Sequence, residues 1–193
     1  MYNAFGKRIC DFILSALGLA ITSPIIIIFL LLSASIHGGG GLFVQTRVGK
    51  NGKHFLIFKI KSMHDGSTSS ITVYGQGNIS KLGQFIRKNK IDELPQLVNV
   101  FFGQMSLVGP RPDVPEMYEN LNQELDPIFS AKPGITGPAQ LLFRDEEAML
   151  AQKEDPEAFY RDVIWKKKLQ VNRKYVANMN FCGDMMYIIK TVL

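Results

Sequence analysis

The stretch Arg87–Pro112, RKNKIDELPQLVNVFFGQMSLVGPRP, decides the fold prediction for this chain. Apolar residues recur within it at the spacing of one buried helix face, namely at Leu94, Leu97, Val98 and Phe101. Three basic residues precede this face, and a Gly-Pro-Arg-Pro turn follows it. We therefore expect a short amphipathic helix between a basic approach and a rigid turn.

An adjacent carboxylate pair, Asp92 and Glu93, stands at the predicted start of this helix. Asp92 takes the N-cap position, and Pro95 falls in the first turn, where its missing N–H does little harm. Because a helix N-terminus favours an ionised carboxylate, we expect Asp92 to be a fixed, ionised group. Such a group suits a nucleophile or a metal ligand that meets a phosphate. Ordinary helix capping explains the same two residues equally well.

Composition indicates membrane association and anionic partners. The 193 residues are 46% hydrophobic and 20% charged, and the apolar excess lies near the N-terminus. The net charge of +5 and the isoelectric point of about 9.2 suit anionic lipids or phosphorylated substrates. No nucleic-acid-binding motif accompanies the charge, so we expect no nucleic acid partner. Cys10 and Cys182 lack metal-ligand spacing and indicate free thiols in a reducing compartment.

Residues 12–36 form an uncharged apolar segment that would measure roughly 37 Å as a straight helix, longer than a hydrocarbon core of about 30 Å. Ser23-Pro24 interrupts its middle, because proline removes a helix hydrogen bond. Basic residues on both flanks favour the cytoplasmic side for both ends. We expect a re-entrant helix broken at Ser23-Pro24, although a kinked spanning helix stays open. The apolar segment is too long for a signal peptide.

Short elements are predicted beyond this segment. Residues 42–48 and 54–63 have the pattern of two strands around an Asn-Gly hairpin signal. Residues 64–77 are polar and predict a mobile loop, and residues 79–86 predict an amphipathic helix. In the loop at 132–138, KPGITGP, glycines let backbone N–H groups approach an anion, although a structural turn has the same pattern.

Trp165 stands beside the lysine run Lys166–Lys168. A tryptophan next to lysines suits a membrane interface, where the ring and the charges meet lipid head groups. A solvated basic helix face has the same sequence, so both interpretations stay open.

KIDELPQLVNVFFGQMSLVGPRP, followed by KPGITGPAQ at 132–140, resembles the core of the bacterial sugar transferase family, the monotopic phosphoglycosyl transferases. The resemblance covers nearly the whole chain, from KRICDFILS to the closing helix. It implies a mostly helical α+β fold, with a re-entrant membrane helix in residues 1–37. Residues 38–193 would form a compact cytoplasmic catalytic domain with a small β-hairpin and amphipathic interfacial helices, at the bacterial cytoplasmic membrane.

The resemblance implies transfer of a sugar 1-phosphate from a UDP-sugar to a polyprenyl phosphate such as undecaprenyl phosphate. Asp92 would attack the phosphate that bears the sugar and release UMP, and the polyprenyl phosphate would then attack the aspartyl-phosphosugar. A covalent intermediate lets a soluble donor and a membrane acceptor use one site in turn. Mg²⁺ is expected to offset the diphosphate charge, with Glu93 and Asp92 as its protein ligands. Whether Glu93 binds the metal or orients Asp92 stays open.

Six further positions are implied as phosphate contacts by the resemblance: Lys59, Arg87, Arg111, Gly134, Thr136 and Gly137. The planar fork of donors on Arg111 suits phosphate oxygens. Lys59 and Arg87 would also be ordinary as solvated surface charges. Many family members carry Trp at the place of Pro138 and an acidic residue at that of Asn172, which leaves the identity of the sugar open.

Two other functions are compatible with the sequence. One is a non-catalytic membrane protein that binds polyprenyl phosphate or acts as a scaffold, which the intact carboxylates and arginines argue against. The other is a phosphatase or pyrophosphatase with an aspartyl nucleophile, for which water rather than polyprenyl phosphate would be the acceptor. A homodimer is compatible with each of these functions.

Overall fold

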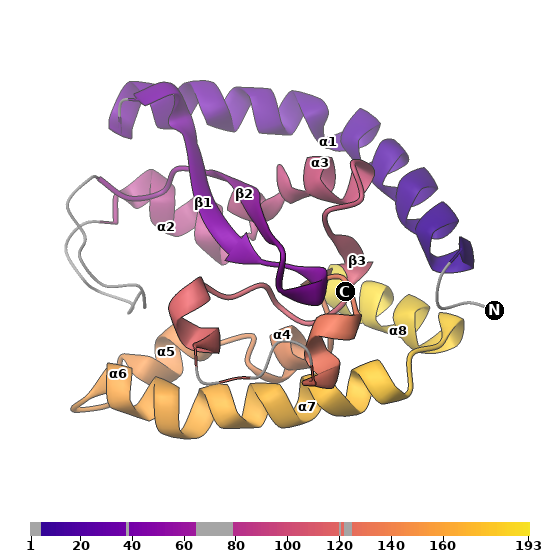
Figure 1. Ribbon diagram of the computed structural model, residues 1–193. Coiled ribbons are helices and arrows are strands. Elements are labelled where there is room, and N and C mark those ends of the chain that lie inside the picture. Colours follow the sequence, from indigo (N-terminus) through magenta and orange to yellow (C-terminus); the bar gives the residue numbers. More distant parts are fainter. Residues whose placement is uncertain (1–4, 38, 65–78, 120, 122–124) are drawn as a thin grey trace.

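The computed structural model describes residues 5–37, 39–64, 79–119, 121 and 125–193, and it shows a mostly helical α+β fold with two small sheets (Figure 1). The elements are α1 (Lys7–His37), β1 (Leu42–Val48), β2 (His54–Ile60), α2 (Lys81–Lys88), α3 (Gln96–Phe101), β3 (Ser106–Val108), β4 (Gly134–Thr136), α4 (Pro138–Leu142), α5 (Glu146–Leu150), α6 (Pro156–Phe159), α7 (Lys166–Ala177) and α8 (Phe181–Val192). A π-helical segment, Tyr160–Trp165, joins α6 to α7. In Figure 1, α1 lies along one side of the molecule and the α6–α7 run along the opposite side, with the hairpin and α3 between them.

The helix α1 is one continuous helix that bends along its length (Figure 1), so the prediction of a helix broken at Ser23-Pro24 is corrected. The Ser23 hydroxyl lies 3.3 Å from the Ala20 carbonyl, to which it donates. That carbonyl is the one deprived of an amide partner by Pro24, so the serine satisfies it and the helix continues. Within the described residues, α1 is the one helix long and apolar enough to cross a membrane, by length and composition. The re-entrant path remains a prediction.

Polar side chains fasten the first turns of α1 to the rest of the chain, and Lys7 forms an ion pair with Asp184 of α8. Arg8 donates to the carbonyls of Val100 and Phe101 at 2.7 and 2.6 Å, which satisfies the C-terminal end of α3. Buried Asp11 accepts from the Ser106 hydroxyl at 3.0 Å and from the Leu107 amide at 2.9 Å, both in β3. The helix α1 is therefore joined to two elements that adjoin the carboxylate pair and the Gly-Pro-Arg-Pro turn.

The predicted β-hairpin is present, with β1 and β2 antiparallel from Leu42 opposite Ile60 to Val48 opposite His54. Its turn carries Asn51 at φ 56° and Gly52 at φ 70°, the left-handed conformation that an Asn-Gly signal predicts. The second strand ends at Ile60, earlier than the predicted range of 54–63. Apart from His64, the predicted loop at 64–77 lies outside the described residues.

The loop predicted at 132–138 contains a strand, β4, which pairs in parallel with β3. Gly134 is opposite Ser106 and Thr136 is opposite Val108 in this small sheet. Because β3 leads directly into the Gly-Pro-Arg-Pro turn, β4 supports the turn from the side.

The larger core cluster fills the space between the hairpin end and the α6–α7 run. Its buried members are Val48, Tyr118, Ile128, Phe129, Leu150, Tyr160, Ile164, Trp165 and Leu169. Trp165 is 7% exposed, and its ring lies 5.2 Å from the Tyr118 ring in an edge-on contact. The interpretation of Trp165 as a membrane-interface residue is therefore wrong, because its ring belongs to the interior.

Candidate active site

The carboxylate pair lies in a 3₁₀ turn, Ile91–Glu93, between α2 and α3. Lys90 enters this turn in the left-handed conformation, with φ 55°. The helix α3 begins at Gln96, three residues after the pair, and no side chain caps its first turn. Asp92 is therefore not the N-cap of this helix, and the capping interpretation is wrong.

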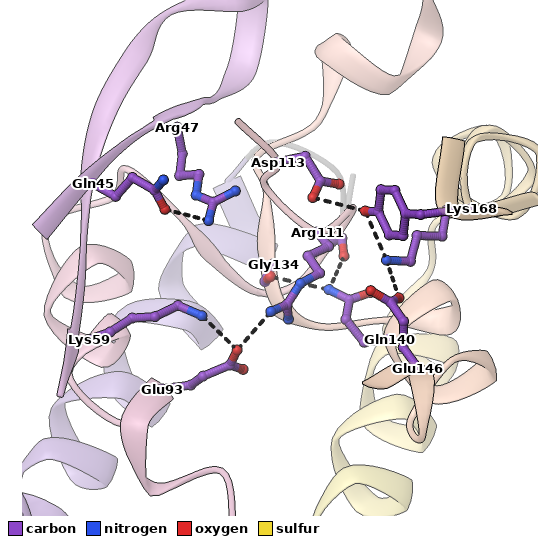
Figure 2. Close-up of polar contacts among 12 residues, drawn as sticks. Gln45, Arg47, Lys59, Glu93, Arg111, Asp113, Gly134, Gln140, Glu146 and Lys168 are labelled. Carbon is purple, nitrogen blue, oxygen red and sulfur yellow. Dashed lines mark hydrogen bonds and ion pairs between the residues drawn. The ribbon is translucent and has the colours of Figure 1, made fainter. Parts of the chain in front are cut away.

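Glu93 is held by two cations. Its Oε1 atom accepts from Lys59 Nζ at 3.0 Å and from Arg111 Nη2 at 2.9 Å (Figure 2). Burial alone would raise the pKa of this carboxyl, since Glu93 is 8% exposed. The nearby charges of Arg111 and then Lys59 outweigh burial and hold the pKa of Glu93 well below its usual range. Glu93 is thus an ionised group whose charge is balanced within the protein.

Asp92 is equally buried and has a contrasting environment. Its Oδ1 atom has no hydrogen-bond partner in the part of the chain that the structure describes. Burial, followed by the adjacent Glu93 charge, raises the pKa of Asp92 to about 6, although Lys59, Arg87 and Lys90 act in the opposite direction. The expectation that a helix N-terminus would favour its ionised form gave the wrong direction, because desolvation and a like charge dominate.

Lys59 and Arg111, two of the predicted phosphate contacts, converge on Glu93 from different elements. Lys59 projects from β2, and Arg111 belongs to the Gly-Pro-Arg-Pro turn. Burial lowers the pKa of Lys59, while the charge of Glu93 raises the pKa of Arg111. Each cation keeps N–H donors beyond the one used on Glu93, because an ammonium has three and a guanidinium has five. A phosphate could therefore bind both cations without displacing Glu93.

Arg87 lies near the end of α2, and its charge is close enough to Asp92 to lower the pKa of that carboxyl. Its Nη1 atom also lies 3.7 Å from Met63 Sδ. The structure therefore places Arg87 beside the carboxylate pair, as predicted. Ser23 and Pro24 lie in α1, away from this cluster, as expected for residues of a helix bend.

Gly134, Thr136 and Gly137 are placed behind the Gly-Pro-Arg-Pro turn. The Gly134 amide donates to the Pro110 carbonyl at 2.8 Å, and the Thr136 hydroxyl lies 2.5 Å from the Thr191 hydroxyl. A Cβ at Gly134 would lie 2.0 Å from the Gly109 nitrogen, and one at Gly137 would lie 2.5 Å from the Gly109 carbonyl oxygen. These residues let two backbone segments pack closely, and their contact with phosphate remains a prediction.

A magnesium site would need ligands from the carboxylate pair. Among the described residues, no group of three His, Cys, Asp or Glu side chains is placed to hold a metal ion. Mg²⁺ commonly takes one or two carboxylates together with substrate phosphates and water. Oε1 of Glu93 already accepts from two cations, which leaves the other oxygen of Glu93 and the Asp92 carboxylate as the groups that could hold such an ion. The pair thus suits a metal that arrives with a diphosphate.

Several residues that Figure 2 places at the site were not predicted from the sequence. Lys168 forms an ion pair with Glu146 and donates to the Tyr160 hydroxyl at 3.3 Å, and that hydroxyl lies 3.5 Å from Asp113 Oδ1. This buried chain of contacts lies behind Arg111. Lys168 follows Trp165 by three residues, a spacing that puts both on one helix face, but the burial of Trp165 was itself not predicted, so no sequence signal pointed to Lys168.

Arg47 and its partner Gln45 were also missed, although strand parity contained a signal for both. Phe43, Gln45 and Arg47 are alternate residues of β1, and the register puts Phe43 opposite Lys59. Residues two apart share a face of a strand, so Gln45 and Arg47 lie on the face that carries Lys59. Arg47 Nη2 donates to Gln45 Oε1 at 2.6 Å (Figure 2).

Comparison with known proteins identifies what this arrangement is similar to. A family model described as "Bacterial sugar transferase" matches residues 2–193. A putative undecaprenyl-phosphate N-acetylgalactosaminyl 1-phosphate transferase of Bacillus subtilis is 40% identical over 131 residues, covering 66% of this chain and 73% of the relative. A UDP-glucose:undecaprenyl-phosphate glucose-1-phosphate transferase of Klebsiella pneumoniae is 33% identical over 197 residues, covering 98% of this chain and 40% of the relative.

An undecaprenyl-phosphate galactose phosphotransferase of Salmonella typhimurium is 32% identical over 207 residues, covering 98% of this chain and 40% of the relative. The chain thus spans about three quarters of the Bacillus relative and about two fifths of the other two.

Proposed function

This chain belongs to the bacterial sugar transferase family, and from that premise we propose that it transfers a sugar 1-phosphate from a UDP-sugar to a polyprenyl phosphate. The relatives described above carry names of undecaprenyl-phosphate sugar-phosphate transferases, which supports this choice of donor and acceptor classes. The first product would be a polyprenyl diphosphosugar, made at the start of glycan or glycoconjugate synthesis.

The observation that carries the proposal is the asymmetry of the carboxylate pair. A nucleophile needs an oxygen that is not already engaged, and Asp92 Oδ1 has no partner among the described residues. A pKa of about 6 leaves Asp92 ionised at pH 7.5 and makes it a more basic carboxylate than an ordinary aspartate. Glu93, with its low pKa and two bound cations, instead has the properties of a positioning group.

The proposed reaction has two displacements at one phosphorus atom. Asp92 Oδ1 attacks the phosphorus that bears the sugar, and the bond from that phosphorus to the bridging oxygen breaks, so UMP leaves with the electron pair. An oxygen of the polyprenyl phosphate then attacks the same phosphorus and releases the Asp92 carboxylate. Each step forms one phosphorus–oxygen bond and breaks one, so the enzyme returns to its starting state.

The cations around the pair would act on both substrates. Lys59 and Arg111 keep unused N–H donors that can bind phosphate oxygens, while Glu93 fixes their positions. Arg87 adds a further positive charge beside Asp92. When bound, Mg²⁺ would supply additional charge neutralisation at the diphosphate, held by Asp92, by Glu93 or by both.

We also propose that residues 1–37 lie in the cytoplasmic membrane as a re-entrant helix and that residues 38–193 form the catalytic domain on the cytoplasmic face. The apolar, largely unburied α1 supports membrane association. Thr22 and Ser23 donate to the carbonyls of Gly18 and Ala20, so the backbone at the bend would be satisfied within lipid. Basic residues on both flanks favour one side of the membrane for both ends.

The experiment that tests the function is a UMP-release assay on the purified protein in nanodiscs, with a panel of UDP-sugars, with and without undecaprenyl phosphate, and with and without Mg²⁺. Release that requires both the acceptor and one particular sugar supports the transferase and names its donor. A single equivalent of UMP per enzyme without acceptor is expected from the first step, whereas multiple turnovers without acceptor would indicate a hydrolase. Absence of release with every donor, combined with binding of polyprenyl phosphate, would favour the non-catalytic binding function.

A further inference from the structure

Arg47 brings a positive charge into the site, and no carboxylate in the described part of the chain forms an ion pair with it. Among the described residues its guanidinium donates to Gln45 Oε1, which belongs to a neutral amide. The Arg47 Nε atom is buried and has no hydrogen-bond partner among residues 5–37, 39–64, 79–119, 121 and 125–193. Within those ranges the ion pairs near it belong to Lys59, Arg111 and Lys168, and none includes Arg47.

A partly buried guanidinium without an ion-pair partner destabilises the protein when no ligand is bound. Removing a guanidinium from water without a counterion is unfavourable, and the burial lowers the pKa of Arg47. Attraction to Asp113 acts in the opposite direction, but Arg111 repels Arg47. The protein therefore holds two guanidiniums near each other in a partly desolvated place, where an anion would relieve both the desolvation and the repulsion.

Arg47 lies beside Lys59 and Arg111, the two cations proposed to bind substrate phosphate. Its charge acts on Lys59 as well as on Arg111, so all three cations border one region. Figure 2 shows Arg47 extending from β1 toward the side of the site where Arg111 and Lys59 lie. Lys59 and Arg111 each form an ion pair with Glu93, whereas Arg47 forms none within the described ranges. A phosphate group, with several oxygens and more than one negative charge, suits a planar fork of this kind.

We propose that Arg47 is a substrate-binding residue whose guanidinium contacts a phosphate oxygen of a phosphorylated substrate, with Gln45 holding the fork in orientation. The inference rests on the proposed function for its substrate classes. Both the diphosphate of the nucleotide sugar and the phosphate of the polyprenyl acceptor offer the required chemistry, so the test below has one arm for each.

A structural role for Arg47 makes the opposite prediction for stability. If the guanidinium stabilised the fold through Gln45 and Asp113, its removal would lower the melting temperature. If the charge is kept for a ligand, Arg47→Met removes a desolvated cation while retaining much of the side-chain volume, and the unliganded protein keeps or raises its melting temperature.

The experiment measures binding rather than turnover, in an Asp92→Asn background that prevents reaction. The binding of UDP and the binding of a polyprenyl monophosphate in nanodiscs are each titrated for Arg47, Arg47→Met and Arg47→Lys. Arg161→Gln is the matched control, because Arg161 is exposed on the π-helical segment. We expect Arg47→Met to weaken one ligand about 10- to 100-fold, the range for one charge-assisted hydrogen bond, and Arg47→Lys to weaken it less.

The ligand whose binding Arg47→Met weakens identifies the substrate that Arg47 contacts. Unchanged binding of both ligands, or a lower melting temperature with unchanged binding, would overturn the inference. The proposed function fails separately: a wild-type protein that binds either ligand but transfers no phosphosugar would refute the transferase while leaving the role of Arg47 in binding open to the same titration.

Discussion

Asp92 and Glu93 are adjacent in the chain and each is 8% exposed, yet their carboxyl groups have opposite electrostatic properties. Glu93 accepts from Lys59 and Arg111 and has a depressed pKa. Asp92 Oδ1 has no partner within the described part of the chain, and its pKa is raised to about 6. The charge of Glu93 is thus used in ion pairs within the protein, while Asp92 keeps an oxygen available for a substrate.

Asp92→Asn should abolish transfer, because an amide lacks the anionic oxygen that forms the bond to phosphorus. We expect UMP release to fall at least about 1,000-fold, as is usual when a covalent nucleophile is removed. The measurement is UMP release with the preferred donor and undecaprenyl phosphate. Asp162→Asn is the control, because Asp162 is exposed and its ion-pair partner among the described residues is Lys166, one helix turn away. Substantial residual turnover in Asp92→Asn would contradict the covalent role.

The pH dependence of turnover should report the raised pKa of Asp92. Below a pH of about 6 the carboxyl becomes protonated and loses its nucleophilic form. We expect kcat/KM to fall tenfold per pH unit below that value and to be level just above it. Steady-state rates across pH 5 to 8, with the donor held well below KM, provide the measurement. A profile that stays level down to pH 4.5 would show that an ordinary aspartate is acting.

Asp92→Asn should also stabilise the fold near neutral pH. A raised native pKa means that the native state holds its proton more tightly than the unfolded state, so stability falls as pH rises toward 6. Above that value, ionised Asp92 opposes folding by up to about 3 kcal/mol. We expect the variant to melt several degrees higher than the wild type at pH 7.5 and at nearly the same temperature at pH 4. Equal melting temperatures at pH 7.5 would contradict this.

Glu93→Gln should have the opposite effect on stability. The change leaves Lys59 and Arg111 facing each other without the carboxylate that both contact. Breaking a buried ion pair from one side costs about 3 kcal/mol. Urea denaturation in nanodiscs measures the loss, with Asp162→Asn again as the matched surface change. We also expect UDP to raise the melting temperature of Glu93→Gln more than that of the wild type, since the diphosphate can replace the missing anion.

The re-entrant path of α1 predicts that both of its ends are inside the cell. In a background with Cys10 and Cys182 changed to serine, a cysteine at Tyr2 should resist a membrane-impermeant maleimide in intact cells and react after permeabilisation. A second variant, in which only Cys10 is changed to serine, keeps the native Cys182, exposed at the start of α8, as the matched reporter for the catalytic domain. Labelling of the Tyr2 position from outside, with Cys182 protected, would show that α1 crosses the membrane.

Much of the local structure could be predicted because it depends on neighbouring residues. The Asn51-Gly52 turn formed where the left-handed preferences of those residues required it, and α3 formed close to the predicted helix. Its buried face was predicted wrongly, because Gln96, Asn99 and Val100 are the buried residues of α3, while Leu97, Val98 and Phe101 are only partly buried. Trp165 was misplaced because its position beside Lys166–Lys168 was taken as the sign of a membrane interface. Its burial depends on contact with Tyr118, which lies 47 positions earlier in the chain, and a local pattern contains no sign of that contact.

The carboxylate pair could be singled out in the sequence as a candidate site, but its electrostatics could not be predicted. Burial of Asp92 depends on segments that come together only in the folded chain, so local capping rules gave the wrong direction for its pKa. Arg47 lies on a strand 45 positions before Asp92, and its relation to Lys59 follows from the hairpin register. Residues that reach a site from another element are visible only once the pairing of the elements is known.

The anchoring of α1 through Arg8 and Asp11 has a geometric consequence for the encounter between enzyme and lipid. These side chains fasten α1 to α3 and β3. The helix α3 follows the 3₁₀ turn that carries Asp92, and β3 leads into the Gly-Pro-Arg-Pro turn. With α1 in the bilayer, the reacting oxygen would therefore be held at a constant height above the hydrocarbon. A polyprenyl phosphate, whose own phosphate is confined to that height, would then find the enzyme by diffusion in two dimensions. Removing the contacts of Arg8 or Asp11 would change the distance between the site and the membrane while leaving the residues of the site unchanged.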